Sequence, residues 1–424
     1  MIRFFIKGLL RDRGRSLFPI IIVTLGVMFT VFLHCWMTGI LGDVIDFSAK
    51  FSTGDVKIMS RAYAENKDQI PNDLALMDVN TLIDSLQNDY PDMTWVQRIR
   101  FSGLLDIPDS VRETRAQSPV MGIAIDLLSP GSKEIDRMNI RKSLVRGHLP
   151  DKPDEILISD AFAQKLKVNP GQIATLISST MFGSMSLQNF TIAGTVNFGT
   201  DAMDRGTIIA DIGDIRKVLD MQDAAGEILG YFNSDFYNDA KAIALAKSFN
   251  KKYENSTDKF APEMFSLSEQ DDLGTLLGTI VIMKSIIVFV FVLAMSIVLW
   301  NAGLLGGLRR YGEVGLRIAI GEEKGHVYRS MIYESIIIGI FGSITGTIVG
   351  LAISYWFQAH GLDFGDIMRN ASIMMPSVYR AHVTPQAFYI GFFPGLLSTV
   401  LGTMLSGIGI YKRKTAQLFK ELEA

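Results

Sequence analysis

One short stretch of the sequence carries charged and apolar residues at a spacing that suits binding. Glu313 and Arg317 lie four residues apart between Gly312 and Gly321, so a helix over this stretch would place both charges on one face. The residues between and after them are too apolar for a fully solvated loop. A helix of this kind predicts a surface that docks another protein. It does not predict a catalytic site. The candidate docking residues are Gly312, Glu313, Val314, Leu316, Arg317, Ile320 and Gly321.

The patterns that would indicate an enzyme are missing from the sequence. No G-x-x-x-x-G-K-[ST] run is present, so the chain lacks the usual nucleotide-binding loop. No H-E-x-x-H occurs, and five scattered histidines with a single cysteine, Cys35, offer no zinc cluster. One cysteine also allows no intramolecular disulfide. We therefore predict a non-enzymatic chain with no catalytic residue, metal or cofactor.

Four apolar runs surround the docking stretch, and each is long enough to cross a bilayer. They cover residues 17–41, 276–304, 331–357 and 387–411. The first run is too long for the core of a cleavable signal peptide and lacks a small-residue cleavage site, which favours an uncleaved span. The docking stretch belongs to segment 305–330, which joins the second and third runs and must therefore lie at a membrane surface.

The charges are divided unevenly along the chain. Residues 1–16, 304–330 and 411–424 carry fourteen Lys or Arg against six acids, whereas residues 43–275 carry twenty-four against thirty-five. Basic residues accumulate in the cytoplasmic segments of membrane proteins. The pattern predicts that 1–16, 305–330 and 412–424 are cytoplasmic. The large segment 42–275 and the short loop 358–386 are then external.

The external segment mixes strand and helix patterns. Residues 51–58 read as a turn that leads into a strand, and further strands are predicted over 95–105, 120–125, 154–159, 190–196 and 207–210. Helices are predicted over 79–86, 160–166, with Asp160 as N-cap, 212–219 and 240–253. The predicted fold is therefore a membrane α-helical protein with four transmembrane helices. A large α+β periplasmic domain, in one or two lobes, is inserted between the first and second helices.

Small and charged residues within the spans suggest how the helices pack. Gly342, Gly346 and Gly350 recur every four residues, as do small residues of the fourth run, and such stripes let another helix approach closely. The alternative is that glycine is simply common in membrane helices. Lys284 and Glu334 lie near the ends of their spans, where they can reach the interface, so a proton-relay transporter is disfavoured.

Several motifs together resemble one family. The run from Gly312 to Gly321 is similar to the coupling-helix motif of FtsX/MacB-type ABC transporter permeases, the type VII or mechanotransmission class. Residues 146–150, 154–158 and 166–171 resemble a periplasmic signature of that family. The chain is most similar to the lipoprotein-releasing LolC/LolE permeases. The similarity lies in its length, in the lack of a fused ATPase, and in residues 190–195 and 211–219. One departure is the loop at 178–189, which is short for the hook with which LolC grips its chaperone.

The resemblance implies a permease subunit in the inner membrane. Separate ABC ATPase subunits would receive the bridge helix, with Glu313 and Arg317 as polar contacts. A second permease copy or paralogue would complete a dimer among membrane lipids, and no nucleic acid is expected. The cargo would be lipoproteins, extracted from the membrane for a periplasmic lipoprotein chaperone.

Other functions stay open at this point. One is a MacB-like efflux permease for another cargo, and a second is an FtsX-like signalling scaffold that controls cell-wall hydrolases. A third is a free-standing receptor, and a fourth treats the bridge as a loop resting in the lipid headgroups. Neighbouring genes would discriminate, since an adjacent ATPase and a paired permease favour transport.

Overall fold

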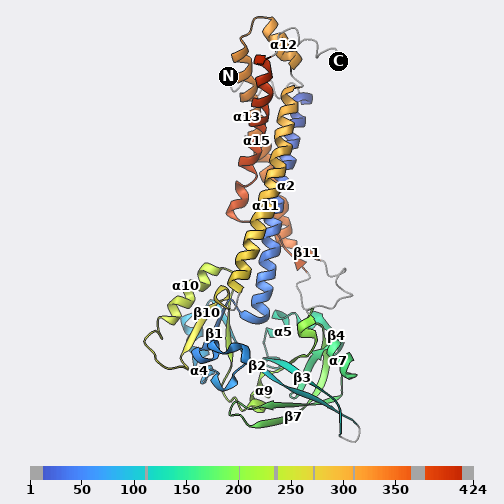
Figure 1. Ribbon diagram of the computed structural model, residues 1–424, viewed down its shortest axis with the longest axis vertical. Coiled ribbons are helices and arrows are strands. Elements are labelled where there is room, and N and C mark those ends of the chain that lie inside the picture. Colours follow the sequence, from blue (N-terminus) through green and yellow to red (C-terminus); the bar gives the residue numbers. More distant parts are fainter. Residues whose placement is uncertain are drawn as a thin grey trace. The chain divides into compact units, whose positions relative to one another are not determined.

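The chain forms two compact units in a computed structural model (Figure 1). The structure describes residues 13–109, 113–199, 201–233, 237–270, 273–308, 311–363 and 378–412. The membrane unit comprises Met1–Leu41, Thr279–Leu362 and Tyr379–Ala424, and the β-rich unit comprises Gly42–Gly278 and Asp363–Val378. The expected basic ends at 1–12 and 413–424, and residues 364–377 of the predicted outer loop, lie outside the described residues.

Four helices are long and apolar enough to span a membrane, as the sequence predicts. They are α2 (Arg13–Ser48), α11 (Leu273–Leu308), α13 (Lys324–His360) and α15 (Phe392–Lys412). Both α2 and α11 have 36 residues, which corresponds to about 54 Å of helix. A hydrocarbon layer is roughly 30 Å thick, so both helices are longer than a bilayer crossing requires. A short π-helix, η1 (Ala49–Thr53), directly follows α2.

Shorter elements complete the membrane-associated part of the chain. The bridge between α11 and α13 contains a separate helix, α12 (Tyr311–Ala319). The 3-10 helix η5 (Pro385–Phe388) precedes α15, and the two-residue strands β11 (Leu362–Asp363) and β12 (Val378–Tyr379) pair with each other.

The glycine stripe of α13 lies against α2 of the same chain. A Cβ added at Gly346 would lie 2.6 Å from the carbonyl oxygen of Thr24. The neighbouring glycines, Gly342 and Gly350, meet Val23 and Val31 in the same way, at 2.7 and 3.0 Å. The two backbones therefore approach where side chains are absent. These contacts account for the stripe without a second permease copy.

Substituting leucine for Gly346 is expected to destabilise the membrane unit. The new side chain would meet backbone, which cannot move aside as a flexible side chain does. Overpacking of this kind typically costs about 1–3 kcal/mol. The thermal midpoint of the purified chain in detergent should fall. Ile348→Ala, on the exposed face of the same helix, is the matched control. An equal midpoint for both variants would mean that α2 and α13 do not pack through this stripe.

The β-rich unit is built on one branched sheet. Its strands are β1 (Val56–Ser60), β2 (Met93–Pro108), β3 (Thr114–Ile125), β4 (Leu144–Gly147), β5 (Glu155–Ser159), β6 (Ile173–Ser179), β7 (Met185–Val196), β8 (Thr207–Asp211), β9 (Glu227–Phe232) and β10 (Pro262–Ser266). The strand order is β10-β1-β9-β2-β3-β8-β5-β7-β4, with β6 paired to β2 and β7. The 16-residue β2 joins two parts of the sheet. Its first half pairs with β9, and its second half pairs with β3 and β6.

Helices supply the rest of the core of this unit. They are α3 (Arg61–Glu65), α4 (Val79–Asp89), α5 (Glu134–Arg137), α6 (Ile140–Ser143), α7 (Asp160–Leu166), α8 (Asp201–Asp204), α9 (Ile212–Leu219) and α10 (Asp239–Asn250). Short 3-10 helices are η2 (Lys67–Gln69), η3 (Asn72–Leu74) and η4 (Leu267–Glu269). Apolar side chains of α4, α7, α9 and α10 pack with the inner faces of the strands in one cluster. The predicted helices and strands of this segment all occur, whereas the strands β4, β6, β9 and β10 and the short helices α3, α5, α6 and α8 were not predicted.

The predicted N-cap of α7 is wrong by one residue. Ser159 caps the helix, and its hydroxyl accepts the amide N–H of Phe162. Asp160 is the first helical residue, and its carboxylate instead accepts Arg146 Nε and Thr195 Oγ1, each at 2.7 Å. Burial raises the pKa of Asp160, but the hydrogen bonds from Thr195, Arg146 and Gln164 outweigh burial and hold that pKa below its usual value.

Candidate docking site on the bridge helix

Helix α12 ends at a glycine that closes its last turn. Gly321 has φ of +102°, a conformation that residues with a Cβ rarely adopt. The N–H of Gly321 donates to the carbonyl of Ile318 at 3.1 Å, and the N–H of Glu322 donates to that of Arg317, also at 3.1 Å. This pair of bonds is a Schellman motif. Gly321, predicted to mark the end of the bridge helix, therefore ends it through a defined backbone geometry.

One face of α12 is fixed to the membrane unit. Tyr311 and Val314 are buried in a cluster with Val327 and Met331 of α13. The hydroxyl of Tyr311 also donates to the carbonyl oxygen of Ser406 in α15 at 2.5 Å. The bridge helix is thus attached to two membrane helices. It does not hang as a free loop between them.

The opposite face of α12 is exposed and partly apolar. The exposed fraction is 49% for Leu316 and 80% for Ile320. Glu313 and Ala319 are exposed as well. These two large apolar side chains, one turn apart on the exposed side, make this face a candidate contact surface. We call Glu313, Leu316 and Ile320, the residue that directly follows the helix, the outer face of α12.

The structure divides the predicted docking residues into two groups. Leu316, Ile320 and Glu313 form the outer face, whereas Val314 is buried inside the chain. Arg317 is held by Glu322 in a two-pronged ion pair, with Nε–Oε2 of 2.6 Å and Nη2–Oε1 of 2.7 Å. The hydrogen bond from Arg317 lowers the pKa of Glu322. Arg317 therefore stabilises the end of the bridge helix within the chain.

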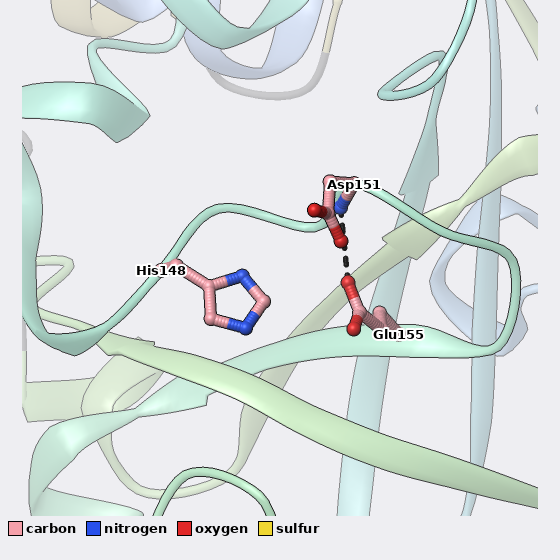
Figure 2. Close-up of side chains that lie close together, drawn as sticks. All are labelled: His148, Asp151 and Glu155. Atoms are coloured by element: carbon pink, nitrogen blue, oxygen red, sulfur yellow. Dashed lines mark hydrogen bonds between the residues drawn. The ribbon is translucent and has the colours of Figure 1, made fainter.

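Among the described residues, one cluster could hold a metal ion, and the sequence patterns did not indicate it. The ligand atoms of His148 and Asp151, in the loop from β4 to β5, and of Glu155, the first residue of β5, lie within 4.8 Å of one another (Figure 2). Glu155 Oε2 accepts the N–H of Asp151 at 2.9 Å, and His148 Nδ1 donates to the carbonyl of Leu149 at 2.8 Å. These bonds stabilise the loop, and the cluster forms only through the loop's conformation.

Comparison with known proteins points to ABC permeases. Residues 285–415 match the family model of the FtsX-like permease C-terminal region. The chain is 30% identical over 97 residues to the macrolide export ATP-binding/permease protein MacB of Mannheimia succiniciproducens, covering 23% of this chain and 15% of MacB. It is 25% identical over 270 residues to the lipoprotein-releasing system transmembrane protein LolC of Xylella fastidiosa, covering 56% of this chain and 62% of LolC.

These matches span less than two thirds of either relative's length. The periplasmic region of MacB from Actinobacillus actinomycetemcomitans aligns in structure with a TM-score of 0.33 and 13% identity, over 51% of this chain and 90% of that region. That likeness is too distant to argue from. The sequence matches confirm the predicted similarity to FtsX/MacB-type ABC permeases and to LolC.

Proposed function

We propose that this chain, with its FtsX-like C-terminal region, is the membrane subunit of an ABC transporter and that α12 couples it to a separate ATPase. The observation that carries the proposal is the outer face of α12, where Leu316 and Ile320 stand exposed on a helix fixed to the membrane unit. The ATPase groove would cover these two side chains, and Glu313 would supply a polar contact at its edge.

The attachment of α12 explains how a push from an ATPase would be transmitted. Tyr311 and Val314 connect the bridge helix to α13 through packing, and the Tyr311 hydroxyl connects it to α15. Close-packed contacts of this kind pass on displacement because they leave little room for local adjustment. Movement of α12 would therefore displace α13 and α15 together, and the chain itself would need no catalytic residue.

The cargo that we propose is a lipoprotein, and the extent of the LolC matches supports this choice. The LolC matches extend over 54–56% of this chain, whereas the MacB matches extend over 22–26%. We propose that the chain extracts lipoproteins from the inner membrane and passes them to a periplasmic carrier. Export of another cargo, as the name of MacB describes, is the second candidate because the MacB matches have comparable identity.

The proposed assembly also contains a second permease copy or paralogue. Of the four long apolar helices, α11 is the least buried. Only 6% of its 18-residue apolar stretch is buried, against 28–44% of the corresponding stretches in the others. Its apolar side chains would be covered partly by lipid and partly by that second subunit. A measurement of the mass of the solubilised complex would give the number of permease copies that it contains.

The docking proposal is tested with aspartate at both exposed apolar positions, Leu316→Asp with Ile320→Asp. Burying two unpaired carboxylates in a protein contact is strongly unfavourable, so co-purification with the proposed ATPase partner should fall at least about tenfold. Val145→Asp, at an exposed apolar residue of the β-rich unit, is the control and should retain the ATPase. Full retention by the double variant would remove α12 as the docking element.

The orientation across the membrane is tested by cysteine labelling in a variant with Cys35 replaced by serine. A cysteine at exposed Asn255 in the β-rich unit should react with an impermeant maleimide in intact spheroplasts. A cysteine at Gln417 should react only after lysis. This follows from the excess of basic residues in the three segments assigned to the cytoplasm. Labelling of position 417 from outside would contradict the four-span arrangement with a periplasmic β-rich unit.

A further inference from the structure

Three side chains of metal-binding type lie together at the start of β5. The imidazole of His148 and the carboxylates of Asp151 and Glu155 face one another (Figure 2). Zinc accepts one imidazole with two carboxylates, and three protein ligands leave the fourth tetrahedral position for water. Bonds from zinc to nitrogen or oxygen are about 2.0–2.2 Å long, so the ligand atoms of such a site lie roughly 3.3 Å apart. Side-chain rotations would close the present spacing, within 4.8 Å, to that value.

The backbone around the cluster is anchored to β7. The N–H of His148 donates to the carbonyl oxygen of Ala193 at 3.0 Å, and Glu155 pairs with Thr191 in the sheet. Between these two points, the N–H of Asp151 donates to Glu155 Oε2 at 2.9 Å. The backbone of each ligand is thus fixed by β7 or by another ligand. Sites supported by strands hold their geometry better than sites on loops alone, so the cluster has the support that a metal site needs.

Glu155 is a buried carboxylate whose charge is not compensated. It is 8% exposed, yet it forms no ion pair with any residue that the structure describes, and its Oε1 accepts no hydrogen bond from them. By contrast, the carboxylate of buried Glu227 lies 3.2 Å from Lys57 Nζ. Burying a charge is costly unless it is paired with an opposite charge or binds a metal ion. A cation between Glu155 and its two neighbours would supply the missing compensation.

The other two ligands also keep lone pairs free for a metal ion. A carbonyl oxygen can only accept, so the 2.8 Å bond to Leu149 places the ring proton of neutral His148 on Nδ1 and the lone pair on Nε2. Metal-binding histidines usually donate their second N–H to a carbonyl or carboxylate in this way. The carboxylate of Asp151 accepts no hydrogen bond from the described part of the chain. Each of the three residues therefore has a ligand atom to offer.

We propose that His148, Asp151 and Glu155 bind a zinc ion, through Nε2 of the imidazole and one oxygen of each carboxylate. The two carboxylates balance the charge of the ion, and the ion neutralises the buried Glu155. Bound zinc would connect the loop after β4 directly to β5 and so stabilise this part of the β-rich unit. The site contains no residue of α12, so it is independent of the proposed docking of an ATPase.

The experiment is calorimetric titration of the full chain with zinc chloride, in detergent, after treatment with a chelator and without a histidine tag. Zinc should also raise the thermal midpoint of the wild type, because an ion bound only to the folded state stabilises that state. Calcium and manganese should bind at least about tenfold more weakly. Calcium prefers six to eight oxygen ligands, and manganese forms weaker complexes than zinc with a given set of ligands.

Two variants remove a ligand without disturbing the backbone. Glu155→Gln keeps an oxygen that can accept the Asp151 N–H, and His148→Ala changes an exposed side chain. Each should lose at least about tenfold in zinc affinity, since changing a residue that merely supports a metal ligand already costs about 10–100-fold. His326→Ala is the matched control, because His326 is exposed and lies 3.6 Å from a single carboxylate, that of Glu322. It should bind zinc as the wild type does.

Three results would overturn the site. Wild-type zinc affinity in both ligand variants would place any bound ion elsewhere, and an unchanged thermal midpoint of the wild type would mean that the folded chain binds no zinc. Equal affinity for calcium would refute the choice of zinc. With chelator present, Glu155→Gln should be at least as stable as the wild type, because the uncompensated charge is gone, and this shows that the variant is folded. The measurement contains no ATPase, so its outcome is separate from that of the docking test.

Discussion

Replacing Glu313 with lysine is expected to abolish stimulated ATP hydrolysis by the partner ATPase and the release of cargo, while membrane insertion is unchanged. Glu313 lies exposed in the first turn of α12, where a carboxylate also suits the positive end of the helix dipole. In the proposed contact its carboxylate meets a basic or hydrogen-bonding group of the ATPase. Charge reversal turns that attraction into repulsion. Removing one member of such a contact costs on the order of 2–5 kcal/mol.

The assay is ATP turnover by the reconstituted complex in lipid, together with co-purification. Glu313→Gln, which keeps the shape and loses the charge, should show an intermediate loss. A bridge that merely rests on the membrane predicts the opposite sign for lysine, because an anionic leaflet attracts an added positive charge. Normal binding and normal turnover of the lysine variant would remove the main physical support for the transporter proposal.

The length of the apolar runs was sufficient to predict the membrane helices, and the spacing of charged and apolar residues was sufficient to predict the bridge helix. The four spans need only their apolar length, and α12 needs only two glycines and its amphipathic pattern. The sequence could not show which face of α12 packs, since Val314 and Leu316 are both apolar. That choice is made by Val327 and Met331 on α13, and their position depends on the tertiary fold.

Contacts between distant segments were the least predictable features. The stripe of α13 predicted a close helix neighbour, but nothing in its spacing identifies α2. The strands β4, β6, β9 and β10 were missed, and their length is not the reason, because β5 and β8 have only five residues each and were predicted. The His148 cluster was missed because its three residues meet only through the conformation of the β4–β5 loop.

Arg98 is the clearest example of a contact between distant segments that the sequence could not predict. It lies in a predicted strand, and a charged side chain there is ordinarily placed on the solvent face, yet it is 2% exposed. Its guanidinium donates to Glu134 Oε2 at 3.0 Å and to the carbonyl oxygens of Lys50, at 2.9 Å, and Phe51. Lys50 and Phe51 belong to η1, at the end of α2, where helical carbonyls lack partners within the helix. Arg98 therefore fixes the end of the first long helix to β2 within the β-rich unit.

Replacing Arg98 with methionine is expected to destabilise the β-rich unit by about 3–5 kcal/mol, the usual cost of removing one partner of a buried ion pair. Methionine fills much of the volume but removes the Arg98 donor from the Phe51 carbonyl and leaves the Lys50 carbonyl with only the Tyr231 hydroxyl, at 3.2 Å. Glu134, itself buried, keeps only its bond from Arg137. Hydrogen exchange of the full chain should show loss of protection in β2, β9 and η1.

Arg100, two residues further along β2, is the matched control for Arg98. It is 38% exposed, and its Nε lies 3.7 Å from Glu227, so Arg100→Met should cost less than about 1 kcal/mol. Equal loss of protection in the two variants would show that burial of the guanidinium does not matter. A loss confined to Arg98→Met, strongest in η1, would show that the buried guanidinium holds η1 against β2.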